Sequence, residues 1–222
     1  MINWIRGNRG FLVFLLLFGL FRTAVADWNP IPSGSMRPNL LEGDVVFVNR
    51  LAYDLKLPLT DIILAHTGEP QRGDIITFSS PKDGTRLIKR VIALPGDQVE
   101  MRDKRIFIND REAQYAALGS VQEPLSHDMS TQALRLTEQV GQERHRIQWL
   151  AGIASMDNFG PLRIPADQFL MLGDNRDNSA DSRFIGLVPR HLLIARAERI
   201  LVSADILGNW SPRFGRFGLS LN

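Results

Sequence analysis

The feature that most constrains this chain is an uninterrupted apolar run, FLVFLLLFGLF, at residues 11–21. Arg6 and Arg9 precede the run and Arg22 follows it. A helix buried in a soluble domain keeps polar positions along one face, and this run has none. The run therefore disfavours a soluble helix and indicates a segment that meets a membrane.

Two membrane interpretations stay open. The positive start, the short apolar stretch and the Ala-Val-Ala tripeptide at 24–26 favour a cleaved signal peptide. Arg22 favours a retained anchor, because it places a charge where a cleavable signal has small neutral residues. With the flanking residues counted, the segment is long enough to span a bilayer. We expect residues 1–26 to form a membrane anchor whose arginine-bearing start stays in the cytoplasm, so that the remainder lies across the membrane.

Composition narrows the function. Of the 222 residues, 44% are hydrophobic and 23% are charged, as in ordinary globular proteins. The net charge is only +2 and the cations are scattered, so no nucleic-acid partner is expected. The chain has no cysteine, which excludes a disulfide framework, a thiolate metal site and a cysteine nucleophile. We expect no cofactor and no metal.

Beyond residue 28 the sequence predicts an all-β fold of antiparallel sheets, because short β-branched runs are bounded by Gly, Pro and Asp. Predicted strands lie at 44–49, 74–78, 86–94, 105–109, 168–172 and 200–203, whereas 192–199 is compatible with helix or strand. Residues 110–162 are polar and irregular. We therefore divide the chain into an anchor (1–26), a catalytic β domain (27–104 and 163–222) and an inserted smaller subdomain (105–162).

Ser35 is a candidate nucleophile. It lies in a Ser-Gly-Ser turn flanked by prolines, shortly after the membrane segment; such a turn is more often a plain surface feature. A serine hydroxyl needs an adjacent base. His66 lies in a predicted loop, and His127 and His145 lie in the polar insertion without an apolar frame. No histidine, His191 included, belongs to a motif that suggests a Ser-His-Asp triad.

Lys89 is the alternative base. Strand alternation places it on the same face as Leu87 and Val91. An apolar surrounding disfavours the ammonium form and lowers the pKa of a lysine, which is what a Ser-Lys dyad requires. A lysine that extends to solvent from a strand edge would fit the same pattern.

A polar loop at 173–183 is dense in hydrogen-bonding groups. A calcium site is disfavoured, because the loop holds two arginines and lacks the alternating aspartates with a final glutamate. We expect a self-paired loop that holds the shape of a site, in which two arginines neutralise three aspartates: Arg176 and Arg183 against Asp174, Asp177 and Asp181.

Together these segments resemble bacterial signal peptidase I, also called leader peptidase. The matching pieces occur in the family's order and cover most of the chain outside the insertion: Pro32-Ser-Gly-Ser-Met36 with Pro38, Gly43-Asp44, Arg72-Gly-Asp74, Lys89-Arg90 with Leu94-Pro-Gly-Asp97, and Gly173 to Ser179 with Asp181-Ser-Arg183.

The resemblance implies a signal-peptidase-like fold and the roles of six residues. Ser35 takes the position of the nucleophile and Lys89 that of the general base. Ser33 matches the serine that helps the Ser35 N–H bind the oxyanion, and Ser179 matches the serine that orients the lysine. Asp181 and Arg183 match a supporting ion pair. Shallow pockets that select Ala-x-Ala sites are implied at Ile31, Met36, Leu40, Val46, Thr77 and Ile88.

The resemblance also implies partners and a location: preprotein signal peptides, a lipid bilayer, and a single-pass protein of the bacterial inner membrane with its catalytic part outside. Leu87 replaces a common aromatic residue and Asn29 a large apolar one, which affects fine substrate preference. Two alternatives stay open: another Ser-Lys protease, such as a pilus peptidase, and a tethered β-domain without catalysis. The second would tend to lose Ser35 or Lys89.

Overall fold

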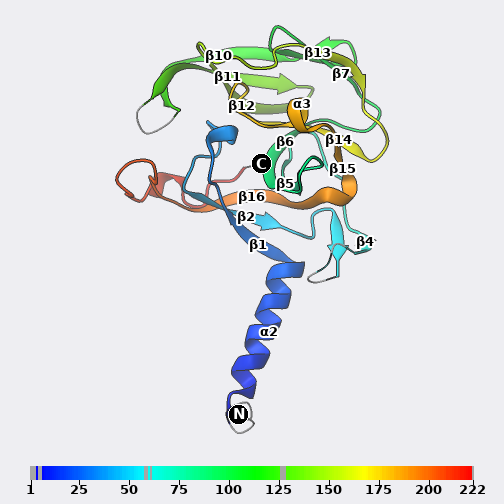
Figure 1. Ribbon diagram of the computed structural model, residues 1–222, viewed down its shortest axis with the longest axis vertical. Helices are drawn as coiled ribbons and strands as arrows, with labels where there is room; N and C mark the ends of the chain where they lie inside the picture. Colours follow the sequence, from blue (N-terminus) through cyan, green and yellow to red (C-terminus); the bar gives the residue numbers. More distant parts are fainter. Residues whose placement is uncertain (1–3, 5–6, 58–59, 61, 126–128, 222) are drawn as a thin grey trace.

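The computed structural model describes residues 4, 7–57, 60, 62–125 and 129–221, so Arg6 and His127 lie outside the described residues. Helix α2 (Arg9–Ala24) projects away from the body of the molecule (Figure 1). It leads into strand β1 (Ala26–Pro30), which already belongs to the main sheet. Among the described residues, none of the helices is both long and apolar enough to cross a membrane.

The main sheet has seven strands in the order β1-β2-β16-β5-β6-β14-β15, and its neighbours run antiparallel. The strands beyond β1 are β2 (Asp44–Asn49), β5 (Ile75–Ser79), β6 (Arg86–Ala93), β14 (Gln168–Leu172), β15 (Val188–Pro189) and β16 (Leu193–Ser203). The prediction of antiparallel sheets is confirmed. Residues 192–199, ambiguous in sequence, fall mostly in β16, where pairing with both β2 and β5 selects the strand.

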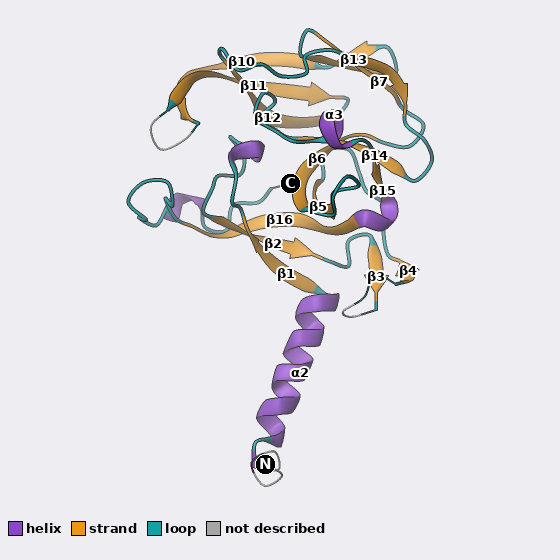
Figure 2. Ribbon diagram, viewed as in Figure 1, coloured by secondary structure: helices purple, strands orange, loops and turns teal. Residues whose placement is uncertain are grey.

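Two smaller sheets lie over one side of the main sheet (Figure 2). One contains β7 (Gln98–Arg102), β8 (Arg105–Ile108), β9 (Arg111–Glu112) and β13 (Phe159–Arg163); the other contains β10 (Gln114–Pro124), β11 (Ser130–Val140) and β12 (Glu143–Leu150). A separate hairpin joins β3 (Asp54–Lys56) to β4 (Ile63–His66). The boundary proposed at residue 105 falls at the turn between β7 and β8.

The expectation of an irregular segment at 110–162 is wrong, because this segment holds the long strands β10, β11 and β12. Only part of each strand is buried, with Leu136 and Ile147 among the covered side chains. Polar residues on the solvent face of an antiparallel sheet dilute the apolar signal along the sequence.

Short helical turns complete the fold: η1 (Gly34–Met36), α3 (Ser182–Ile185), η2 (Arg190–Leu192) and η3 (Phe214–Arg216). The turn η1 contains Ser35 at its centre. Its last residue, Met36, is fully buried in a core cluster that includes Leu40, Val46 and Ile75. The apolar side chain of Met36 therefore anchors the turn to the core.

Candidate active site

The Ser35 turn is held by hydrogen bonds to its backbone as well as by apolar packing. The backbone N–H of Asn175 donates to the carbonyl oxygen of Ser35 at 3.1 Å. The side-chain amide of Asn175 donates to the carbonyl oxygen of Gly34 at 3.0 Å. Ser35 itself is only 9% exposed. The segment is therefore fixed to the 173–183 loop, which lies about 140 positions further along the chain in sequence.

The side chain of Lys89, in strand β6, lies next to Ser35 of the turn η1. Strand β6 pairs with β5 in a register that places Lys89 opposite Ile76. The Nζ atom of Lys89 lies 2.8 Å from Ser35 Oγ and 2.8 Å from the carbonyl oxygen of Ile88. The side chain is 2% exposed, so it does not extend to solvent from a strand edge.

The charge state of Lys89 follows from this burial. Removal from water lowers the pKa of Lys89 from 10.5 to about 8, although the Asp181 and Asp174 carboxylates oppose the shift. Among the described residues, Nζ donates to a hydroxyl and a carbonyl, and neither carries a charge. A neutral amine in hydrogen-bond reach of a serine hydroxyl can accept its proton.

The two other predicted serines differ in their contacts. The Ser33 hydroxyl donates to Ser35 Oγ across 3.4 Å, a long hydrogen bond. Ser179 Oγ is buried and has no hydrogen-bond partner among the described residues, so the predicted bond to Lys89 is not formed here. Gly173 separates the two loops: a Cβ added to it would lie 2.2 Å from Ser179 Oγ and 2.5 Å from the Ser35 carbonyl oxygen. Any larger residue at 173 would push these loops apart.

Asp181 and Arg183 form the predicted ion pair. Arg183 donates to both Asp181 carboxylate oxygens at 2.8 Å, and both side chains are almost completely buried. Asp181 also accepts from the backbone N–H of Gly173 at 3.0 Å, and it caps α3 through the N–H of Arg183. The pair therefore ties the beginning of the 173–183 loop to its end.

The expectation that the loop neutralises its own charges is wrong for its other members. Asp174 pairs with Arg90 of β6 through two bonds of 2.8 Å. Asp177 accepts from Lys104, which follows β7, at 2.9 Å. Arg176 pairs with Glu138 of β11. Proximity in sequence misleads here because a loop enclosed by three sheets meets charges from each of them.

The predicted pocket residues are all covered in this structure. Ile88 is partly buried, and the other five are buried: Ile31, Met36, Leu40, Val46 and Thr77. Thr77 donates a 3.3 Å hydrogen bond to the Ala195 carbonyl oxygen. The other five residues belong to the core cluster that contains Met36 or pack against it. They present little surface in this structure.

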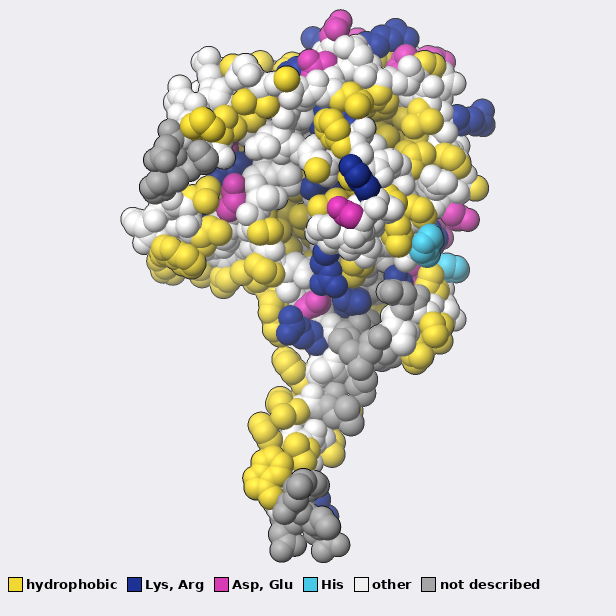
Figure 3. Space-filling model, viewed as in Figure 1, with side chains coloured by type: hydrophobic (Ala, Val, Ile, Leu, Met, Phe, Trp, Pro, Cys, Tyr) yellow, Lys and Arg dark blue, Asp and Glu magenta, His cyan; other side chains and the backbone are white. Residues whose placement is uncertain are grey.

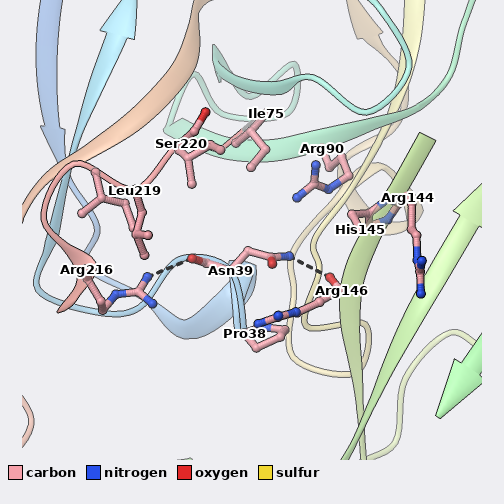
Figure 4. A pocket seen from close by; sticks show the side chains of 12 residues that line it. Pro38, Asn39, Ile75, Arg90, Arg144, His145, Arg146, Arg216, Leu219 and Ser220 are labelled. Carbon is pink, nitrogen blue, oxygen red and sulfur yellow. Dashed lines mark hydrogen bonds between the residues drawn. The ribbon is translucent and has the colours of Figure 1, made fainter. Parts of the chain in front are cut away.

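Sequence reasoning missed Asn39 and Asn175. The side-chain amide of Asn39 donates to the Asp174 carboxylate at 2.6 Å. It also donates to the Arg146 carbonyl oxygen at 2.7 Å, and the backbone carbonyl oxygen of Asn39 accepts from Arg216 (Figure 4). A cavity of about 410 Å³ opens beside it. Asn175 belongs to the Gly173 to Ser179 motif, but the motif does not assign it a contact, and no local pattern marks Asn39; the partners of both lie more than a hundred positions away.

Among the described residues, no histidine hydrogen-bonds to the Ser35 or Lys89 side chain. His66 pairs with Asp54 at 2.7 Å in the β3–β4 hairpin and is 60% exposed. The side chain of His145 is buried, and its ring lies beside the Glu138 carboxylate. Within the described chain, the side-chain partners of Ser35 Oγ are Lys89 and Ser33.

Comparison with known proteins agrees with this geometry. The sequence model of the family described as "Signal peptidase, peptidase S26" matches residues 1–202. Signal peptidase I of Pseudomonas fluorescens is 34% identical over 226 residues, which cover 96% of this chain and 78% of that protein. Signal peptidase I of Rickettsia typhi is 34% identical over 219 residues, which cover 91% of this chain and 81% of that protein.

The relative from Pseudomonas aeruginosa, also a signal peptidase I, is 32% identical over 225 residues that cover 96% of this chain and 78% of that protein. The chain is therefore a serine endopeptidase, a hydrolase. It belongs to the signal peptidase family, peptidase S26.

Proposed function

We propose that this enzyme removes signal peptides from exported preproteins, with Ser35 as nucleophile and Lys89 as general base. The observation that carries the proposal is the 2.8 Å approach of Lys89 Nζ to Ser35 Oγ inside a buried site. Burial supplies the neutral amine, and the hydrogen bond supplies the path for the proton.

The reaction is acyl transfer. Neutral Lys89 takes the proton of Ser35 while Oγ attacks the scissile carbonyl carbon, and the carbonyl π electrons move onto oxygen. The Ser33 hydroxyl and the Ser35 N–H stabilise that oxyanion; loss of one such donor costs on the order of 10²–10³ in rate. The intermediate collapses, the C–N bond breaks, and Lys89 protonates the leaving amine. Water, deprotonated by Lys89, then attacks the ester and restores Ser35.

Ser179 and the Asp181–Arg183 pair act on the site indirectly in this proposal. Ser179 remains the residue proposed to orient Lys89: its hydroxyl is buried and has no hydrogen-bond partner among the described residues, so its hydrogen-bonding capacity is available for the lysine. Asp181 holds Gly173 against the Ser35 carbonyl, and its charge keeps the pKa of Lys89 from falling further.

The substrate preference in this proposal rests on the resemblance to signal peptidase I. Of the six pocket residues that the resemblance implies, Ile88 retains part of its exposed surface, whereas the other five are buried in this structure. We propose cleavage after Ala-x-Ala sites, with the substrate extended along a strand edge.

We propose further that residues 1–26 anchor the enzyme in the bacterial inner membrane by a single span, with the catalytic part on the periplasmic or outer side. The support is the set of exposed apolar side chains along α2 (Figure 3), which includes Phe11, Phe14, Leu17 and Phe18. The division into a catalytic domain (27–104 and 163–222) and an insertion (105–162) is part of the same proposal.

The test is cleavage of a preprotein with an Ala-x-Ala site by the purified full chain. Ser35→Ala and Lys89→Ala each abolish cleavage, because one removes the nucleophile and the other its base. Ser120→Ala and Lys82→Ala, the same changes at exposed positions, leave the rate unchanged. Full activity in either of the first two variants rejects the dyad.

A further inference from the structure

The Ser35 turn has a second support besides Asn175. Arg37, two residues after Ser35, is 7% exposed and donates through Nε to Glu42 at 2.7 Å. Its Nη1 donates to Glu123, which lies in β10 of the insertion. The guanidinium thus joins the turn to a strand that begins almost eighty residues later in the chain.

The Arg37–Glu42 pair packs against Gly34, the residue directly before Ser35. A Cβ added to Gly34 would lie 2.8 Å from Glu42 Oε1 and 3.1 Å from Arg37 Cδ. The ion pair fills the space that a side chain at 34 would need. A displacement of the guanidinium is therefore transmitted to the peptide that links Gly34 to Ser35.

Glu123 sets where that guanidinium lies. Its side chain is 1% exposed, and its second oxygen accepts from Arg135 Nη2 of β11 at 3.1 Å. The network contains two buried carboxylates and two guanidinium groups, so its charges balance: Glu42 and Glu123 with Arg37 and Arg135. Such buried ionic networks contribute little net stability, since desolvation offsets their attraction, but they specify one geometry.

We propose that Glu123 is a positioning residue for Ser35, acting through Arg37, so that the inserted β10–β12 sheet takes part in the reaction by fixing the nucleophile turn. In Figure 1 the turn, in blue, lies beneath this sheet, as the contact requires. The inference rests on the proposed role of Ser35.

The first test is Glu123→Gln, measured as kcat and KM for preprotein cleavage. The amide keeps the shape and loses the charge, and Arg37 retains Glu42, so the fold is preserved. We expect kcat to fall about tenfold, which corresponds to misplacement of the nucleophile by a fraction of an ångström. KM stays within about twofold, because no pocket residue changes. The matched control is Glu112→Gln, which breaks an exposed pair with Arg105 in the neighbouring sheet and leaves kcat unchanged.

The second test is a double-mutant cycle with Arg37→Gln. If Glu123 acts through Arg37, the double variant falls no further than Arg37→Gln alone. Additive losses, or a Glu123→Gln variant with a lower melting temperature and wild-type kcat, overturn the inference.

Ser35→Ala in the same assay separates this inference from the proposed function. If Ser35→Ala still cleaves, the proposed function fails whatever Glu123→Gln does. If Ser35→Ala is inactive and Glu123→Gln is as fast as wild type, only the positioning role fails.

Discussion

Two adjacent cations of strand β6 have opposite surroundings. Arg90 is buried and faces the Asp174 carboxylate through two bonds of 2.8 Å. Lys89, on the other side of the strand, is equally buried but donates only to a hydroxyl and a carbonyl. One cation is neutralised by a partner, whereas the other is left to lose its proton. Burial without a paired carboxylate therefore favours loss of the proton from Lys89, as the proposed role of a base requires.

Replacing Lys89 by arginine, the residue type at the neighbouring position 90, has the largest expected effect. Lys89→Arg places a cation that stays protonated at any ordinary pH beside Ser35. With no proton acceptor, the cleavage rate falls by about 10³-fold or more at pH 8. The measurement is kcat/KM with the preprotein substrate, and Lys82→Arg at an exposed position is the control. Retention of a tenth of the activity contradicts a general-base lysine.

Loss of the Arg90–Asp174 ion pair is expected to lower the stability of the fold. Asp174→Asn leaves the buried Arg90 without its carboxylate, so the free energy of unfolding falls by about 3–5 kcal/mol. Denaturant unfolding measures this. Glu112→Gln, which breaks an exposed pair, costs less than about 1 kcal/mol in the same experiment. Equal losses in the two variants argue against the buried pair as a structural element.

Lys89 has the opposite relation to stability. Its pKa in the folded chain, about 8, lies below the ordinary 10.5, so the unfolded chain binds the proton more tightly. The folded state is therefore penalised below pH 8, and the penalty disappears as the pH rises through 10.5. Lys89→Met removes it. The stability of this variant relative to wild type should be greater at pH 7 than at pH 11 by about 3 kcal/mol, since one pKa unit corresponds to about 1.4 kcal/mol. Denaturant unfolding at both pH values measures the difference, and a pH-independent difference contradicts a depressed pKa.

The smallest effect sharpens the role of Asp181. Cleavage by the wild type should rise with pH and level off above about 8, as Lys89 deprotonates. Asp181→Asn removes a charge that favours the ammonium, so the midpoint of kcat/KM against pH moves to lower values. The variant also weakens the pairing of Arg183, so its folding is checked by circular dichroism. An upward shift of the midpoint contradicts this electrostatic assignment.

Sequence reasoning succeeded where the signal is local. The β-branched run around Lys89 predicted its strand, and alternation placed it on an apolar face. It failed for β10–β12, whose solvent faces are polar, and for the partners of Asp174 and Asp177. Those partners come from strands or turns far along the chain, and no periodicity reports which of them a loop will meet.

The sequence by itself determined the residue types available to the proposed chemistry: a serine in a glycine turn, a lysine in an apolar strand, and no cysteine. It also determined the antiparallel strands, because β-branched alternation and turn residues act between neighbours in the chain. Only the tertiary structure decided that Lys89 reaches Ser35, that Arg90 takes the carboxylate nearby, and that Glu123 reaches Arg37. These outcomes depend on distances between residues about 50 to 90 positions apart, which are set by how the sheets pack.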